Sequence, residues 1–104
     1  MKWEGVLLQA CVMLGGERYY SQYLDDHLWG FPDGTEVVEG SNALPAYVAE
    51  LLRVKCCPDG LAPVYENHLH SMGYRAAMAK PTARILAAMV ALGHLTIEQA
   101  REVT

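Results

Sequence analysis

Two cysteines and two histidines in the middle of the chain are the side chains best suited to hold a metal ion. Cys56 and Cys57 are adjacent, and a single residue separates His68 from His70. A tetrahedral zinc site needs spacers such as Cys-x2-Cys so that two sulfur atoms reach one ion, whereas adjacent cysteines project apart. Histidines two positions apart on a helix point to different faces. We therefore expect neither a metal nor another cofactor, and we interpret these histidines as one core and one exposed residue.

Acid, base and phenol side chains gather in residues 19–27, where Asp25-Asp26-His27 follows three tyrosines. Proton transfer requires such groups to converge in a pocket. On a helix, which we expect here, only pairs three or four apart, such as Tyr23 and His27, share a face. The chain also lacks a phosphate-binding glycine loop and a Gly-x-Ser-x-Gly elbow. We therefore predict that the protein is not an enzyme. The alternative, a small enzymatic or metal-binding domain, would use Asp26, His27, Cys56 or His68.

Charge is distributed unevenly along the 104 residues. Twelve acidic and eight basic residues give a net charge of −4. Residues 1–52 hold two basic and eight acidic residues, a net −6, whereas residues 53–104 hold six and four, a net +2. This balance argues against direct contact with nucleic acid, which is bound by basic surfaces. It is also too small for a mimic of duplex DNA, which presents one charge per roughly 1.7 Å.

The acidic half contains a segment, residues 25–39, with five carboxylates, no Lys or Arg, and two interleaved aromatic residues. Aromatic rings are typical of the centres of protein interfaces, and carboxylates around them attract basic partner residues. The segment therefore predicts a partner-binding surface. A plainer interpretation is that the acids are solvated and the rings cap the core. The candidate partner-binding residues are Asp25, Asp26, Trp29, Phe31, Asp33, Glu36 and Glu39.

These residues must be positioned by a mainly α fold, because most apolar residues recur at helical spacing. We predict a single compact domain over residues 1–104, with five or six short helices and one small β-hairpin near residues 29–38. A Pro-Asp-Gly turn joins the two strands of that hairpin. Thr96 and Gln99 have the spacing of a capping box at the start of the last helix. The predicted helices span 3–14, 17–28, 45–55, 61–73 with a weaker continuation to 81, 81–92 and 96–104.

The three cysteines are an odd number, and a disulfide between Cys56 and Cys57 would strain the backbone, so we expect reduced thiols and a cytoplasmic location. The longest uncharged stretches, residues 5–16 and 85–97, are shorter than the roughly 18 residues that a membrane span needs. No membrane segment is therefore predicted.

No stretch of the chain matches a family motif. Its general profile, a compact and acidic chain with few cysteines and no catalytic signature, is similar to small phage-encoded inhibitors such as anti-CRISPR proteins. This resemblance implies a nucleic-acid-handling partner that is blocked sterically or electrostatically. We therefore expect a module that presses residues 25–39 against a basic protein surface. The alternative is a helical subunit or homodimer, with Leu8, Val12 and residues 72–78 in a permanent interface.

Overall fold

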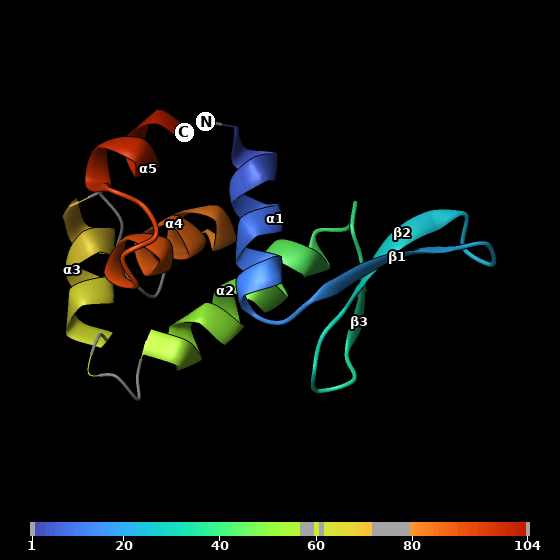
Figure 1. The fold of residues 1–104 in the computed structure, drawn as a ribbon. Helices are drawn as coiled ribbons and strands as arrows, with labels where there is room; N and C mark the ends of the chain where they lie inside the picture. The colour runs from blue at the N-terminus through green and yellow to red at the C-terminus, as the bar shows by residue number, and fades with distance from the viewer. Residues whose placement is uncertain (1, 57–59, 61, 72–79, 104) are drawn as a thin grey trace.

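The computed structural model describes residues 2–56, 60, 62–71 and 80–103. Within these residues the chain forms five helices and a three-stranded antiparallel sheet, which confirms the mainly α class with a small hairpin. The helices lie together, and the strands project from one side of them as an arm (Figure 1). The helices are α1 (Trp3–Met13), α2 (Ala43–Cys56), α3 (Ala62–Ser71), α4 (Pro81–Ala91) and α5 (Ile97–Val103). The strands are β1 (Glu17–Ser21), β2 (Asp26–Gly30) and β3 (Glu36–Val38).

Helix α4 lies at the centre of the helical body. It contacts each of the other four helices, and residues 85–89 are completely buried. Two of these five residues are alanines, whose small side chains let neighbouring helices approach closely. Pro81 occupies the first turn, where a missing backbone N–H costs nothing. The alanine-rich helix that the sequence predicts here is therefore confirmed, and it is the element around which the core forms.

The predicted helix over residues 17–28 is wrong. These residues form the hairpin of β1 and β2, in which Arg18 pairs with Trp29 and Tyr20 pairs with His27. Aromatic side chains favour strands, and Asp25 adopts a left-handed backbone conformation (φ 51°) that interrupts a helix. The helical spacing of the apolar residues did not indicate burial, because Tyr23 is 97% exposed.

The predicted hairpin near residues 29–38 is confirmed as β2 and β3. Trp29 pairs with Val37, and the backbone N–H of Gly34 donates to the carbonyl of Phe31 at 2.9 Å in the connecting turn. The strand β2 starts earlier than the sequence predicts and is the central strand, with β1 on its other side. The two hairpins together make one meander that leaves the helical body after α1 and returns to it at α2.

The ends of the remaining helices follow the sequence closely. Helix α1 ends at Met13, and Gly15, two residues later, adopts a left-handed conformation (φ 79°). The capping box is confirmed, because the N–H of Thr96 donates to Oε1 of Gln99 at 2.9 Å and the N–H of Gln99 donates to Oγ1 of Thr96 at 3.1 Å. The weak helical series after residue 73 and Cys57 lie outside the described residues. Among the helices that are described, none has the length and apolar character needed to cross a membrane.

Candidate functional site

The sheet has two faces, because side chains alternate along each strand. The register places Arg18, Tyr20, His27, Trp29 and Val37 on one face, which we call the inner face. Trp29 and Val37 of this face join the helical core. The opposite or outer face carries the residues Glu17, Tyr19, Asp26, Leu28, Gly30, Glu36 and Val38. Every candidate residue on the strands can be assigned to one of these faces.

Trp29 and Phe31 are core residues. Their side chains are only 3% and 5% exposed. The indole N–H of Trp29 donates to Glu39 Oε1 at 3.2 Å, and the Phe31 ring lies edge-on to that of Tyr47, with 5.0 Å between ring centroids. This burial corrects the expectation that the two rings face a partner. They fix the base of the arm to the helices instead.

Glu39 forms a bidentate ion pair. The guanidinium of Arg18 donates from Nε to Oε1 at 2.7 Å and from Nη2 to Oε2 at 2.9 Å. Since Arg18 lies on β1 and Glu39 follows β3, the pair spans the whole sheet. The hydrogen bond to Arg18 lowers the pKa of Glu39 below its ordinary value, despite some opposing desolvation. Glu39 is thus neutralised by a neighbour from its own half of the chain, and its role is to hold the sheet together.

The ion pair between Arg18 and Glu39 should make the melting temperature of the protein depend on pH in acid. The pKa of Glu39 is lowered on folding from 4.5, so its contribution is complete above pH 4.5 and is lost as pH falls through the folded-state pKa. We expect the melting temperature to fall below pH 4.5, and to fall less steeply in the Glu39→Gln variant. Thermal unfolding followed by circular dichroism at several pH values measures this. A variant whose slope below pH 4.5 matches that of the parent protein would contradict the assignment.

Asp33 also has a structural role. Its carboxylate accepts the backbone N–H of Thr35 at 2.9 Å and the hydroxyl of Tyr47. The hydrogen bond from Tyr47 is the main reason why the pKa of Asp33 is lowered. Asp33 is an exposed residue, yet its two carboxylate oxygens hold the turn between β2 and β3 against α2. Asp33 therefore adds negative charge to the arm, but both of its carboxylate oxygens already accept hydrogen bonds within the protein.

The remaining three candidate acids lie on the arm. Asp25 accepts a hydrogen bond from the hydroxyl of Tyr20, and Asp26 accepts the backbone N–H of His27 at 2.7 Å. Glu36 is exposed on the outer face. Burial raises the pKa of Tyr19, and the interaction of Tyr19 with Glu36 raises it further. Among the residues that the structure describes, none of these three carboxylates forms an ion pair with a basic side chain. Their charge is available to a partner.

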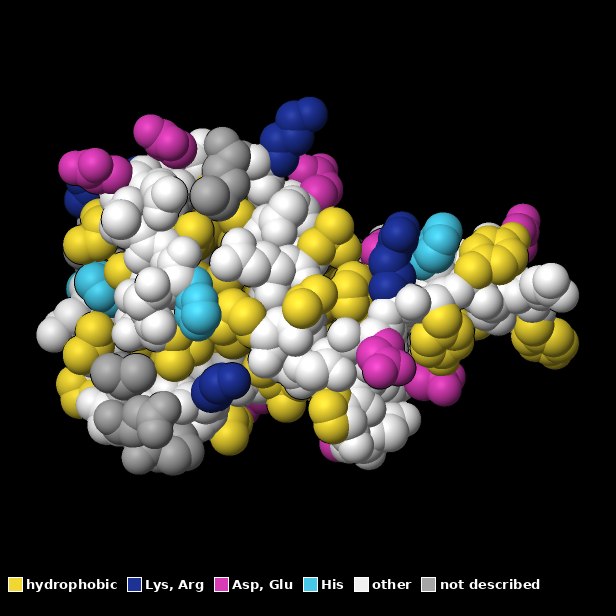
Figure 2. Space-filling view, viewed as in Figure 1, with side chains coloured by type: hydrophobic (Ala, Val, Ile, Leu, Met, Phe, Trp, Pro, Cys, Tyr) yellow, Lys and Arg dark blue, Asp and Glu magenta, His cyan; other side chains and the backbone are white. Residues whose placement is uncertain are grey.

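The structure adds a feature that the sequence interpretation missed, an exposed hydrophobic group on the β1–β2 hairpin. Yellow and magenta side chains adjoin one another along the arm in Figure 2. The adjacent pair Tyr19-Tyr20 is a strand signal, because aromatic residues favour strands, whereas the neighbouring apolar residues have helical spacing. We call the three strands and their connecting turns, residues 17–38, the hairpin arm. The exposed fractions are 39% for Tyr19, 50% for Tyr20, 97% for Tyr23 and 52% for Leu24.

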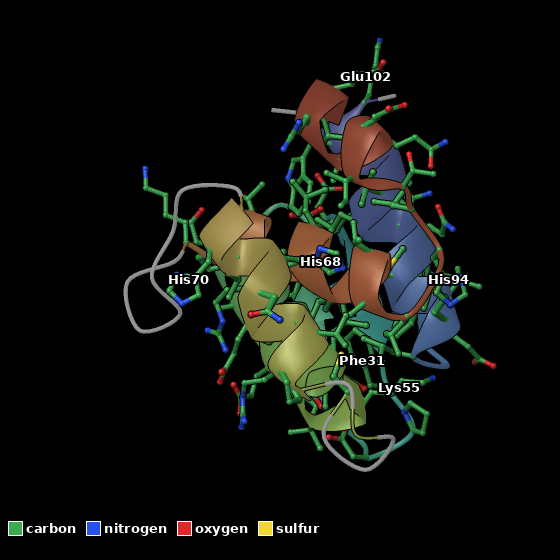
Figure 3. All side chains as sticks on the ribbon, turned by 90° about the vertical axis from the view of Figure 1, so that its left-hand side faces the viewer. Phe31, Lys55, His68, His70, His94 and Glu102 are labelled. Carbon is green, nitrogen blue, oxygen red and sulfur yellow. The ribbon has the colours of Figure 1, made fainter. Side chains whose placement is uncertain are left out.

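Of the residues considered for acid–base chemistry, Tyr20 contacts Asp25 and also His27, with 5.4 Å between ring centroids, on the exposed hairpin. The residues considered for metal binding do not meet in one place among the described residues. No group of three His, Cys, Asp or Glu side chains that could hold a metal ion occurs within the described part of the chain. His68 is half-buried and His70 is exposed on α3, and His94 lies apart from both (Figure 3). Cys56 is buried at the end of α2. Burial raises the pKa of the third cysteine, Cys11, to about 12, so this thiol stays protonated at neutral pH.

The fold and the site together define a small helical protein with an acidic, tyrosine-rich β-hairpin projecting from its body. Comparison with models of protein families, with curated proteins and with solved structures yields no match. The function is therefore argued from the geometry and chemistry of the hairpin arm.

Proposed function

We propose that this protein is a protein-binding module whose hairpin arm docks on a basic surface of another protein. One observation carries the proposal: four large hydrophobic side chains are exposed on one hairpin, beside carboxylates that no basic side chain of the described residues neutralises. Groups of exposed apolar side chains on small proteins commonly mark interaction sites. The arm also stands clear of the helices, so a partner can reach it from several sides (Figure 1).

The composition of the arm suits protein recognition. Tyrosine buries a large, rigid ring at a low cost in side-chain entropy, and its hydroxyl can stay hydrated at the rim of an interface. Asp25, Asp26 and Glu36 supply the negative charge that attracts a basic partner during approach. The proposal thus keeps the acidic segment from the sequence and replaces Trp29 and Phe31, which are buried, with the exposed tyrosines.

We extend the proposal to a partner that handles nucleic acid, because surfaces that bind phosphates present the Lys and Arg residues that the arm requires. The arm would cover a few of these residues and would block the path of the nucleic acid by its bulk. Its carboxylates would repel phosphates, so direct binding of the arm to nucleic acid is not expected. Duplex DNA added in excess should therefore displace the protein from its partner. Failure of DNA to displace it would contradict this extension.

A triple substitution in the arm tests the docking role. We expect Tyr20→Ser, Tyr23→Ser and Leu24→Ser together to weaken capture of partner proteins at least about tenfold, because their buried area is lost. The bait is the purified protein in a lysate of cells that encode it. The matched control carries three serines at exposed valines on helices, Val12, Val54 and Val64.

The docking role is judged from the two variants together with the salt dependence of capture. The control should retain the proteins that the parent captures, and capture should weaken as salt rises from about 50 to 500 mM. An arm variant that captures the same proteins in the same amounts as the parent would overturn the docking role.

The alternative, a helical subunit or homodimer, has one observation in its favour. Leu8 and Val12 on α1 are 38% and 64% exposed, whereas residues 72–78 lie outside the described residues. Sedimentation of the isolated chain tests this alternative. A stable dimer that the Val12→Ser substitution dissociates would favour it over the docking module, and a monomer would argue against the homodimer.

A further inference from the structure

Two glutamates on the outer face of the sheet flank a position without a side chain. Glu17 of β1 and Glu36 of β3 both pair with Gly30 of the central strand, so the three residues form one row across the sheet. Neighbouring strands lie roughly 4.8 Å apart, which places the two glutamate backbones about 10 Å from each other. Because Gly30 carries no side chain, the central strand places no side chain between the two glutamates of this row.

An aromatic ring takes up part of the space above Gly30. Cε1 of Tyr19 lies 3.4 Å from the point that a Cβ atom on Gly30 would occupy, so the ring leans over the glycine. Together with Tyr19 and Gly30, the residues Gly15, Glu17, Phe31 and Pro32 line a pocket of about 430 Å³. The pocket therefore combines a ring, apolar walls and a carboxylate. Glu36 does not line the pocket, but its electrostatic interaction with Tyr19 places a second carboxylate near the ring.

The charge of the outer face is uniformly negative among the described residues. Glu17, Asp26 and Glu36 belong to it, whereas Arg18, the basic residue of the strands, lies on the inner face and is paired with Glu39. A positively charged group is therefore the chemical complement of the pocket. The apolar walls at Phe31 and Pro32 suit the methylene stem that carries such a group in a long side chain.

We propose that this pocket binds an arginine side chain of the protein partner. The guanidinium stacks on the ring of Tyr19 and donates hydrogen bonds to Glu17 and Glu36, while its stem lies against Phe31 and Pro32. Arginine is favoured over lysine because its planar group stacks on rings and donates to two acceptors at once. The inference rests on the proposed function, since it names the partner group that the hairpin arm recognises.

The probe is N-acetyl-arginine methylamide, added to the 15N-labelled protein. We expect the backbone amides of Tyr19 and Gly30 to shift and to saturate at millimolar probe, the affinity typical of one side chain. The corresponding lysine derivative should bind about threefold or more weakly. The citrulline derivative, which has nearly the same shape without the charge, should cause no saturable shift. Shifts that do not saturate with the arginine probe would overturn the proposal.

Variants locate the binding. The double substitution Glu17→Gln and Glu36→Gln should weaken arginine binding at least about fivefold, because both acceptor charges are removed. Gly30→Val should abolish binding by filling the pocket, and the double variant provides the answer if Gly30→Val does not fold. Glu66→Gln, an exposed site on α3, is the control for loss of charge and should bind like the parent protein. Equal arginine affinity in the parent and the double variant would overturn the proposal.

The two proposals fail in different ways. Loss of partner capture by the arm variant, with no arginine binding in the pocket, would contradict the pocket alone. Saturable arginine binding, with unchanged partner capture by the arm variant, would contradict the docking role of the arm. The arm variant leaves Glu17, Tyr19 and Gly30 intact, so the two measurements are independent.

Discussion

Replacing Trp29 with alanine is expected to lower the free energy of unfolding by about 3–5 kcal/mol, the loss that follows removal of a large buried aromatic ring. The ring is 3% exposed, and it packs in the same core as Val37 of the paired strand. Its indole N–H also donates to Glu39, so the substitution leaves a carboxylate oxygen with one partner fewer. Trp29 thus joins the arm to the helices through packing and through a hydrogen bond.

Urea unfolding followed by circular dichroism measures this loss. The matched control is Tyr23→Ala on the same hairpin, where the ring is 97% exposed and the expected change is within about 0.5 kcal/mol. A loss below about 1 kcal/mol in Trp29→Ala would show that the ring is not a core residue. It would then return to the set of candidate partner contacts. The pair of variants therefore separates the structural aromatic residue of the arm from the exposed ones.

The helices could be predicted from the sequence because their signals are local. A run of apolar residues three and four apart, followed by glycine, specifies α1 without knowledge of its neighbours. The same is true of Thr96 and Gln99, whose two hydrogen bonds involve side chains only three positions apart. Residues 17–28 carry a similar spacing by coincidence. Their strand conformation depends on pairing between residues 17–21 and 26–30, and on burial of Trp29 in the core with helices that are distant in the sequence.

Only part of the candidate site could be predicted, because composition is local in the sequence whereas strand pairing is not. The acids of residues 25–39 could be found by composition, and Asp25 and Glu36 do lie exposed on the arm. The ion pair of Glu39 could not be predicted from the sequence, because Arg18 reaches Glu39 only when β1 lies beside β2. The row of Glu17, Gly30 and Glu36 could not be predicted either, because it arises only from the register of three strands. Non-local pairing thus decides which charges remain available.

Replacing Gly16 with alanine is expected to destabilise the protein by about 2–3 kcal/mol, because the residue has no room for a side chain. A Cβ atom there would lie 2.8 Å from the carbonyl oxygen of Cys11 and 3.1 Å from the rings of Trp29 and Phe31. The backbone carbonyl cannot move cheaply, since it accepts the N–H of Gly16 at 2.9 Å. This bond and the one from Gly15 to Val12 form the glycine-dependent end of α1.

Gly5 of the same helix is the matched control. Nothing lies within 4 Å of a Cβ atom at that position, so Gly5→Ala should stabilise the protein by about 0.5–1 kcal/mol through helix propensity. Urea unfolding of both variants should therefore give shifts of opposite sign. Equal shifts would contradict the close approach of the turn to Trp29 and Phe31. Since Gly15 and Gly16 connect α1 to β1, that approach also sets the direction in which the arm leaves the body, and with it the surface that the proposed partner would meet.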